Sequence, residues 1–250
     1  MTQQRFTGRV ALITGASRGI GLAIAQRLVA EGARVCLTAR KAEPLAEAAA
    51  GLGEPDVAIW AAGSSDDPEH RQRAISDTMA AFGRLDVLVN NSGINPVYGP
   101  LLQLDEAAAR KIFEVNVLAT LAWTKLACQA WLSEHGGAVV NVASIAGLHA
   151  TPGIGFYGVT KAALINLTQQ LAAELAPAVR VNAVAPAVVK TKFAEALYAA
   201  DEDAAAARYL LKRLGEPADV AAAVAYLGSA DAGWVTGQTL VLDGGLVGGL

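Results

Sequence analysis

Short apolar runs alternate along the chain with longer segments in which apolar residues recur at helical spacing. The first run, Val10–Thr14, predicts a buried strand, and the spacing within 18–31 predicts a helix that Gly32 ends. Further strands are predicted at 34–39, 57–61, 85–90, 138–143, 179–185 and 238–242. Helices are predicted between them at 42–51, 68–82 and 105–134, and a further helix carries Tyr157.

Strands that alternate with helices in this way predict a parallel sheet with helices on both of its faces. The predicted strands are nearly continuous apolar runs, as parallel strands covered on both faces should be. No linker, low-complexity segment or internal repeat interrupts the pattern. We therefore expect the α/β class, with residues 1–250 forming a single Rossmann-type doubly wound domain around a seven-stranded parallel sheet.

Composition and charge exclude several classes of partner. The 250 residues are 53% hydrophobic and 17% charged, with a net charge of −3, whereas typical domains are about 25% charged. No basic block favours nucleic acid or an anionic membrane, and no apolar run is long enough to span a bilayer. Neither a signal peptide nor metal-ligand spacing among the three histidines is evident. Cys36 and Cys128 lie in apolar runs, which suits buried, reduced thiols. We expect a soluble cytoplasmic protein without a metal.

The stretch TGASRGIG at 14–21 joins the first predicted strand to the first helix and holds Gly15, Gly19 and Gly21. Glycine permits left-handed dihedrals and close backbone approach, and a helix N-terminus offers free N–H groups to an anion. The spacing differs from the common G-x-G-x-x-G fingerprint, and no Gly-Lys-Ser/Thr follows. A turn that needs glycine only for packing is the alternative. Three glycines in this turn favour a dinucleotide pyrophosphate.

The end of the second predicted strand indicates which dinucleotide binds. An acid there usually holds the ribose 2′-hydroxyl, but the chain has Thr38, Ala39 and Arg40 at this place and no acid between Glu31 and Glu43. Arg18 and Arg40 could instead hold a 2′-phosphate, since guanidinium groups suit phosphate well. We therefore expect NADP(H) rather than NAD(H), unless both arginines are simply surface charges.

Tyr157 and Lys161 are four residues apart, so they share one face of the predicted helix. A fixed ammonium beside a phenol favours the phenolate and lowers its pKa, which would make Tyr157 a proton donor and acceptor for a carbonyl or hydroxyl. Such a pair, taken alone, is more often a partly solvated helix face.

Several motifs in this order resemble the short-chain dehydrogenase/reductase family in its compact single-domain form, over Gly8 to Gly245. They are TGASRGIG at 14–21, NNSG at 90–93, YGVTK at 157–161, RVNAVAP at 180–186 and GQTLVLDGG at 237–245. The resemblance implies that Tyr157 is the general acid/base and that Lys161 lowers its pKa and binds the nicotinamide ribose. It also implies that Ser144 polarises the substrate oxygen and that Asn116 anchors a water of a proton relay.

The same resemblance implies a set of cofactor contacts. Asn90 and Gly93 would lie along the adenosine, and Val189 and Thr191 would contact the nicotinamide carboxamide. The full expected set is Gly15, Ser17, Arg18, Gly19, Ile20, Gly21, Arg40, Ser64, Asn90, Gly93, Tyr157, Lys161, Val189 and Thr191. The chain departs from the family pattern at Gly63 and Ser64, where an acid often meets adenine, at Ala187, usually a glycine, and at Ser92, usually an alanine.

The chain resembles the 3-oxoacyl carrier-protein reductases, and INPVYGPL at 94–101 is similar to short-chain carbonyl reductases. The resemblance implies an NADP(H)-dependent oxidoreductase that transfers a hydride between nicotinamide and a small-molecule carbonyl or secondary alcohol. It also implies a mobile helical lid around 192–214 over the substrate, and a homotetramer. A nucleotide-binding sensor or scaffold with vestigial catalysis is the alternative. A hydrolase is disfavoured, because no G-x-S-x-G surrounds Ser144.

Overall fold

Seven parallel strands form one sheet in the order β3-β2-β1-β4-β5-β6-β7 in the computed structural model, which describes residues 4–246. The strands are β1 (Val10–Thr14), β2 (Arg34–Ala39), β3 (Ala58–Ala62), β4 (Val87–Asn90), β5 (Gly137–Val142), β6 (Val179–Pro186) and β7 (Thr239–Leu242). Every residue of β1 is buried, as expected for a central strand covered on both faces. The predicted Rossmann-type doubly wound sheet is confirmed.

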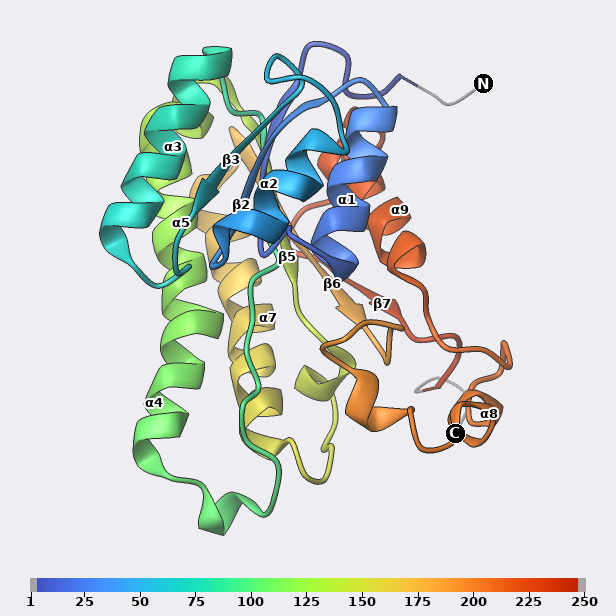
Figure 1. The fold of residues 1–250 in the computed structure, drawn as a ribbon. Coiled ribbons are helices and arrows are strands. Elements are labelled where there is room, and N and C mark those ends of the chain that lie inside the picture. Colours follow the sequence, from blue (N-terminus) through green and yellow to red (C-terminus); the bar gives the residue numbers. More distant parts are fainter. Residues whose placement is uncertain (1–3, 247–250) are drawn as a thin grey trace.

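Helices cover both faces of the sheet (Figure 1). On one face lie α1 (Gly19–Ala30), α2 (Ala42–Ala50) and α9 (Pro217–Gly228), whose apolar side chains share a core with β1, β2 and β4. On the other face lie α3 (Pro68–Phe82), α5 (Ala119–Ala127) and α7 (Gly155–Leu175), which pack around the buried Trp123. The two apolar layers hold the sheet in place, and loops surround the carboxyl ends of its strands.

The helix predicted at 105–134 is one continuous rod with two changes of winding. It runs from α4 (Glu106–Phe113) through a π-helical turn, η2 (Glu114–Leu118), into α5, and then through a second π turn, η3 (Cys128–Leu132), into α6 (Ser133–His135). Single π turns inside α-helices are frequent at functional sites. The first of these turns carries Asn116.

The segment 192–214 differs from the helical lid that the sequence predicts. Among these residues only a 3₁₀ turn, η5 (Glu195–Leu197), and the six-residue α8 (Glu202–Ala207) are helical, and the rest is irregular. The alanine run 204–207 forms most of α8, which ends at its C-cap Arg208. The remaining short elements are the 3₁₀ turns η1 (Leu101–Gln103), η4 (Ile145–Gly147) and η6 (Ala230–Ala232).

The strand order places the loops after β1 and β4 side by side, because these two strands are neighbours from which the chain winds outward in opposite directions. Ligands of open α/β sheets bind at the carboxyl ends of the strands, at such a switch point. The glycine-rich loop follows β1 and the NNSG segment follows β4. Both motifs therefore meet at the edge where a ligand of this fold is expected.

A buried carboxylate ties the start of β1 to the start of β4. Asp86 is 3% exposed and accepts hydrogen bonds from Arg9 Nη1 at 2.8 Å, from Arg84 Nη2 at 2.7 Å and from the Val10 amide at 2.9 Å. Burial alone would raise the pKa of Asp86, but the hydrogen bonds from Arg84, Arg9 and Val10 outweigh it and hold that pKa below its ordinary value.

We expect Asp86→Asn to lower the free energy of unfolding by about 3 kcal/mol at pH 7, because it leaves two arginines facing a neutral group in a buried position. Since the folded-state pKa of Asp86 is depressed, its contribution is present above the unfolded pKa of about 4 and is lost as the pH falls through the folded value. Urea unfolding should therefore separate wild type and variant at pH 7 and bring them together in strong acid. The exposed Asp203→Asn is the control; equal stability of wild type and Asp86→Asn at pH 7 would contradict the prediction.

Candidate active site

Ser144, Tyr157 and Lys161 come together beyond the carboxyl end of β5. Ser144 follows β5 by two residues and begins η4, where its Oγ accepts a hydrogen bond from the Ala146 amide at 3.2 Å. Tyr157 is in the first turn of α7, and its hydroxyl lies within hydrogen-bonding reach of Ser144. Lys161 is one turn further along α7, and its Nζ lies 5.5 Å from the centroid of the Tyr157 ring. Two hydroxyls and an ammonium thus share one small region.

The electrostatics of the pair differ from the sequence-based expectation. Burial raises the pKa of the Tyr157 phenol, and the hydrogen bond with Ser144 opposes this rise only in part. The Nζ of Lys161 lies 5.5 Å from the centroid of the phenol ring and donates a hydrogen bond to the Val142 carbonyl at 2.7 Å. Burial also lowers the pKa of Lys161 to about 8. At neutral pH the phenol is therefore protonated, which is the form that donates a proton.

Asn116 is fully buried beside this group. Its Oδ1 accepts a hydrogen bond from the Ile94 amide at 2.8 Å, and its Nδ2 donates to the Ile94 carbonyl at 3.1 Å and to Thr160 Oγ1 at 3.0 Å. Gly93 fits between them, since a Cβ there would lie 3.4 Å from Lys161 Nζ and 3.5 Å from Asn116 Oδ1. The structure thus places Asn116 near Lys161 and holds the segment after β4 against α7.

The glycine loop has the shape of an anion cradle. Gly15 and Gly19 have φ of 66° and 58°, in the left-handed region, and a Cβ at Gly21 would lie 2.5 Å from the Gly15 carbonyl oxygen. Arg18 occupies the N-cap of α1 in an extended conformation, and its side chain does not cap the helix. The first N–H groups of α1 are thus left without a side-chain acceptor, which suits a phosphate. The residues present fit a dinucleotide pyrophosphate.

Thr14 and Asn91 hold this loop, and sequence reasoning did not identify either of them. Asn91 Nδ2 donates to the carbonyls of Thr14 at 2.8 Å and Gly15 at 3.0 Å, while Thr14 Oγ1 accepts from the amides of Asn91 and Ser92. The sequence feature that could have identified Asn91 is the Asn-Asn pair at the end of β4. Successive side chains of a strand point to opposite sides, so only one of the two can reach β1.

The side chain of the other asparagine of the pair, Asn90, is buried in the interior. Its Nδ2 donates to Asn141 Oδ1 at 2.9 Å and to Thr124 Oγ1 at 3.3 Å, and the residue is 3% exposed. Gly93 lies beside Lys161, as its contacts show. Any contact of Asn90 with the cofactor would therefore be through its backbone.

The packing of the loop after β3 explains why the chain has a glycine at position 63, where it departs from the family pattern. A Cβ at Gly63 would lie 2.3 Å from Cγ of His70, whose fully buried ring fills the space that a larger residue needs. The next residue, Ser64, donates to the carboxylate of Asp66, which also pairs with Lys111 on α4. A neutral hydroxyl supported by an ion pair thus stands where an acid is usual.

The nicotinamide end of the expected site lies next to the glycine loop. A Cβ at Gly19 would be 3.3 Å from Cγ2 of Thr191, whose Oγ1 donates to the Val189 carbonyl at 3.3 Å. The Val189 side chain is buried in the core. Ala187 donates its amide to the Leu242 carbonyl at 3.0 Å, and among the described residues only Lys212 is a non-glycine with positive φ. The methyl group of Ala187 therefore strains no backbone.

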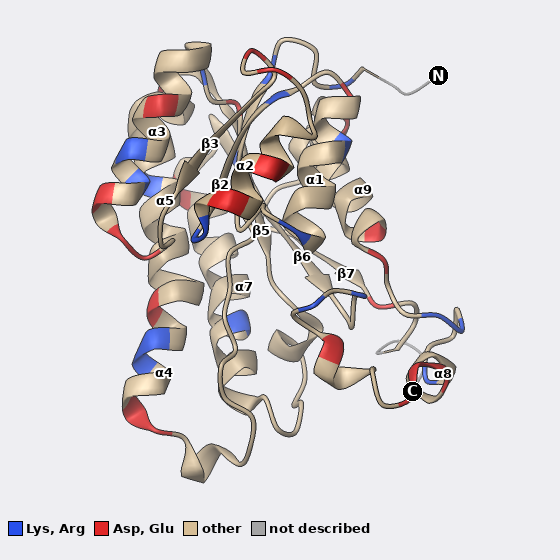
Figure 2. Ribbon diagram, viewed as in Figure 1, with Lys and Arg blue, Asp and Glu red and all other residues tan. Residues whose placement is uncertain are grey.

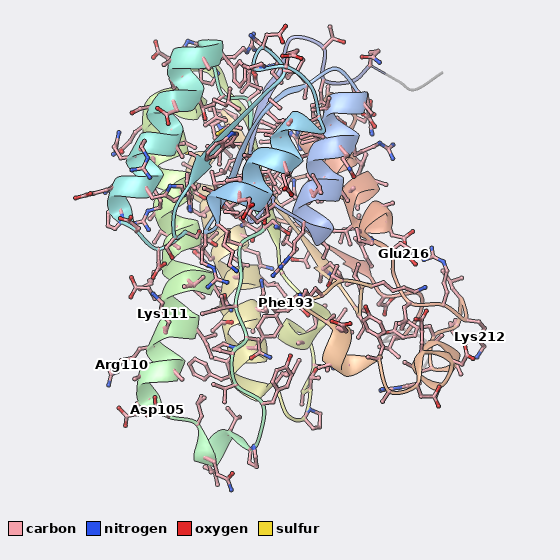
Figure 3. All side chains as sticks on the ribbon, viewed as in Figure 1. Asp105, Arg110, Lys111, Phe193, Lys212 and Glu216 are labelled. Atoms are coloured by element: carbon pink, nitrogen blue, oxygen red, sulfur yellow. The ribbon has the colours of Figure 1, made fainter. Side chains whose placement is uncertain are left out.

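Phe193 is the part of the predicted lid that reaches the catalytic group. Its ring centroid lies 6.1 Å from that of Tyr157 in α7, and Figure 3 labels it near this helix. Tyr209, Leu210 and Leu211 were also expected over the substrate, but they line a separate cavity of about 440 Å³ beside β7. The first part of the segment therefore lies beside the catalytic group, and residues 209–211 lie at another cavity.

Charges and arginines complete the site. The chain carries no charged residue from 87 to 104 or from 136 to 160, whereas Figure 2 shows acidic and basic residues along α4. Arg18 and Arg40 are exposed, and neither forms an ion pair with any residue from 4 to 246. Ser17 and Ile20 are partly exposed in the glycine loop.

Within residues 4–246 no cluster of potential metal ligands occurs, and no helix is long and apolar enough to cross a membrane.

Comparisons with known proteins agree with this geometry. The family model described as enoyl-(acyl carrier protein) reductase matches residues 15–247. Dehydrogenase/reductase SDR family member 4 of Caenorhabditis elegans is 40% identical, with 97% of this chain and 96% of the relative covered. Tropinone reductase-like 3 of Erythroxylum coca is 38% identical, with 98% and 95% covered. A solved short-chain dehydrogenase/reductase from Brucella melitensis, titled a glucose/ribitol dehydrogenase, has a TM-score of 0.93, 32% identity and 98% coverage of both chains.

The chain therefore belongs to the short-chain dehydrogenase/reductase family. It is an NAD(P)-dependent oxidoreductase of CH–OH or C=O groups, as its relatives indicate.

The distance between Ser144 and Tyr157 is set by a close backbone contact that the motifs do not reveal. A Cβ at Gly158, on α7, would lie 2.6 Å from the Ala146 carbonyl oxygen, and a Cβ at Gly147, in η4, would lie 2.6 Å from the Lys161 carbonyl carbon. Both distances are shorter than any side chain tolerates against backbone. The two glycines therefore allow η4 to rest directly on α7.

We expect Gly158→Ala to lower turnover by about 100-fold, because the methyl group pushes η4 and Ser144 away from Tyr157, and a displacement of about 1 Å can have that effect. Cofactor affinity should change little, because the glycine loop is not touched. Steady-state kinetics and a cofactor titration measure the two effects. Gly51→Ala is the matched control, since its Cβ would make only ordinary contacts of 3.5 and 3.6 Å. Unchanged turnover in Gly158→Ala would show that the contact does not position Ser144.

Proposed function

We propose that the protein is an NADP(H)-dependent reductase of small carbonyl compounds that can also oxidise the corresponding secondary alcohols. The observation that carries this proposal is the placement of Ser144, Tyr157 and Lys161 next to an uncapped, glycine-rich helix N-terminus. Bound NADPH would supply the hydride. The chain itself supplies the groups that hold the carbonyl oxygen and give it a proton.

The proposed roles follow from the environment of each side chain. Negative charge grows on the carbonyl oxygen as its carbon accepts the hydride, and the hydroxyls of Ser144 and Tyr157 stabilise that charge. The protonated phenol of Tyr157 then donates its proton to the oxygen, so that the C=O bond becomes CH–OH. The ammonium of Lys161 stabilises the phenolate that remains, and Asn116 anchors the relay that returns a proton to it.

The preference for NADP(H) over NAD(H) rests on three neighbouring features. β2 ends in Thr38 and Ala39 without an acid, Arg40 follows, and Arg18 stands at the N-cap of α1. Both guanidinium groups are exposed and free of ion pairs with described residues, so each can turn toward a 2′-phosphate. Ser64, with the support of Asp66, would meet the adenine.

A free ketone or aldehyde is the favoured substrate, and an acyl group delivered by a carrier protein is the second candidate. An acidic carrier requires an exposed basic patch. The segment 190–213 does not form one, because its five basic residues are nearly balanced by four acidic ones, Lys190 pairs with Glu202 and Glu216, and Arg213 pairs with Asp219. A relative named tropinone reductase-like 3 supports the first candidate, and the description of the matching family model supports the second.

Assembly and location follow the family expectation. Apolar side chains are exposed on three elements, including Leu121 on α5, Val159 on α7 and Val241 on β7. Exposed apolar patches of this kind support burial between subunits, and we propose a homotetramer in the cytoplasm. A sensor or scaffold is not favoured, because Ser144, Tyr157, Lys161 and Asn116 are all present. That alternative would gain if the cofactor bound but no carbonyl in a broad panel were reduced.

We expect Tyr157→Phe to lower kcat by about 1,000-fold, because the variant keeps the ring but loses the proton donor. NADPH affinity should change little, which a fluorescence titration checks independently of turnover. Tyr226→Phe, an equivalent change on the partly exposed side of α9, should keep wild-type kcat. Substantial turnover in Tyr157→Phe would exclude this residue as the acid.

We expect Arg40→Ala to weaken NADPH binding by about 10–100-fold and to leave NADH binding nearly unchanged, since a hydrogen bond to a charged group contributes about 1.5–3 kcal/mol. Dissociation constants of both nucleotides, measured without substrate, give the result. Arg110→Ala removes a similarly exposed arginine from α4 and serves as the control. Tighter binding of NADH than of NADPH to the wild type would refute the preference itself.

A further inference from the structure

A second, smaller cavity lies directly beside Tyr157. It has a volume of about 140 Å³ and lies between the segment 95–104, α4 and the first turn of α7. Val97, Leu104, Ile112 and Phe156 contribute apolar side chains to its wall, and Tyr157 itself forms part of the lining. Ile112 is buried, so the cavity reaches from the surface into the interior.

The wall formed by the segment 95–104 is held in place. The Gly99 amide donates to the Gly153 carbonyl at 2.9 Å, which ties the segment to the turn before α7. Leu101 packs on α7 so closely that a Cβ at Gly155 would lie 2.9 Å from its side chain. A cavity with fixed walls is preformed, as ligand sites usually are.

The lining carries no charge. Its polar side chains are the neutral amides of Asn95 and Gln103 and the hydroxyls of Tyr98 and Tyr157. The nearest charged residues in the chain after Gln103 are the acids Asp105 and Glu106, at the start of α4 (Figure 3). No cation is among the lining residues, and Lys161, 5.5 Å from the centroid of the Tyr157 ring, donates to the Val142 carbonyl, so a carboxylate or phosphate placed here would lose its hydration without a cation in the cavity wall. The lining is neutral and about equally polar and apolar, and the cavity therefore favours a neutral group.

The volume of the cavity further limits which chemical group fits it. An apolar protein cavity of about 150 Å³ binds benzene, so a volume of about 140 Å³ is enough to hold one six-membered flat ring. Aromatic rings also pack well against the tyrosine side chains, and Tyr98 and Phe193 are each about half exposed near Tyr157. The exposure of these two rings leaves their apolar surface available to a ligand.

We propose that this cavity is the subsite for a phenyl-sized ring next to the reacting carbonyl, and that the substrates are neutral aryl ketones or aldehydes. This inference rests on the proposed reductase function and goes beyond it, because it specifies what is attached to the carbonyl. Val97 and Leu104 bound the ring, while Ser144 and Tyr157 hold the oxygen.

The experiment compares kcat/KM for four methyl ketones with NADPH: acetone, phenyl methyl ketone, 2-naphthyl methyl ketone and phenyl methyl ketone with a para carboxylate. We expect the phenyl compound to exceed acetone by about 100-fold, from burial of the ring. The naphthyl and carboxylate compounds should each fall at least about 10-fold below it, because the first exceeds the cavity and the second brings an unpaired charge into it.

Val97→Trp fills the cavity and should lower the ratio of kcat/KM for phenyl methyl ketone to that for acetone by at least about 10-fold. Leu102→Trp is the matched control: Leu102 lies in the same segment but is fully exposed and does not line the cavity, so the ratio should not change. Fluorobenzene binding, followed by ¹⁹F line broadening, gives a readout without turnover. Broadening should be lost in Val97→Trp and kept in Leu102→Trp.

The outcomes separate this inference from the proposed function. If ketones are reduced but phenyl methyl ketone is no better than acetone, the subsite is refuted and the reductase function stands. Equal effects of Val97→Trp and Leu102→Trp would also refute the subsite. If no ketone is reduced while fluorobenzene binds and Val97→Trp abolishes that binding, the cavity takes the ring and the proposed reaction is wrong.

Discussion

The backbone contact between η4 and α7 is the constraint on which the catalytic group depends. Ser144 begins one of these elements, and Tyr157 and Lys161 belong to the other. With a side chain at either Gly147 or Gly158 the two could not approach as they do. The sheet determines where β5 ends, and the contact with α7 determines the direction in which η4 continues from it. Together they determine where the Ser144 hydroxyl lies relative to the Tyr157 hydroxyl.

Much of the fold could be predicted because its signals are local. The strands are uninterrupted apolar runs, and α3 begins at Pro68 and ends before Gly83, whose φ of 71° is a common helix terminator. Within 192–214 the structure forms only the short helical pieces η5 and α8, because the alanine-rich stretch that favours helix is short and is flanked by turns. The π turn at Asn116 could not be predicted from the sequence either, because it changes how the helix is wound and not the pattern of apolar and polar residues.

The catalytic residues could be predicted from motifs, but their surroundings could not. Spacing alone placed Tyr157 and Lys161 on one helix face. It could not show that the ammonium bonds the Val142 carbonyl and lies over the ring, which depends on how far apart α7 and β5 pack. The sequence likewise does not distinguish the role of Asn90 from that of Asn91, because both belong to one motif. Only the direction of β4 shows that one supports the interior and the other the glycine loop.

Two consecutive residues of α4 have separate partners. Lys111 pairs with Asp66 in the loop after β3, on the expected adenine side, and Ile112 forms part of the cavity beside Tyr157. One helical turn thus belongs to both halves of the ligand site. Because a helix moves as a rigid body over such a short distance, any displacement of α4 that follows occupancy of one half is transmitted mechanically to the other.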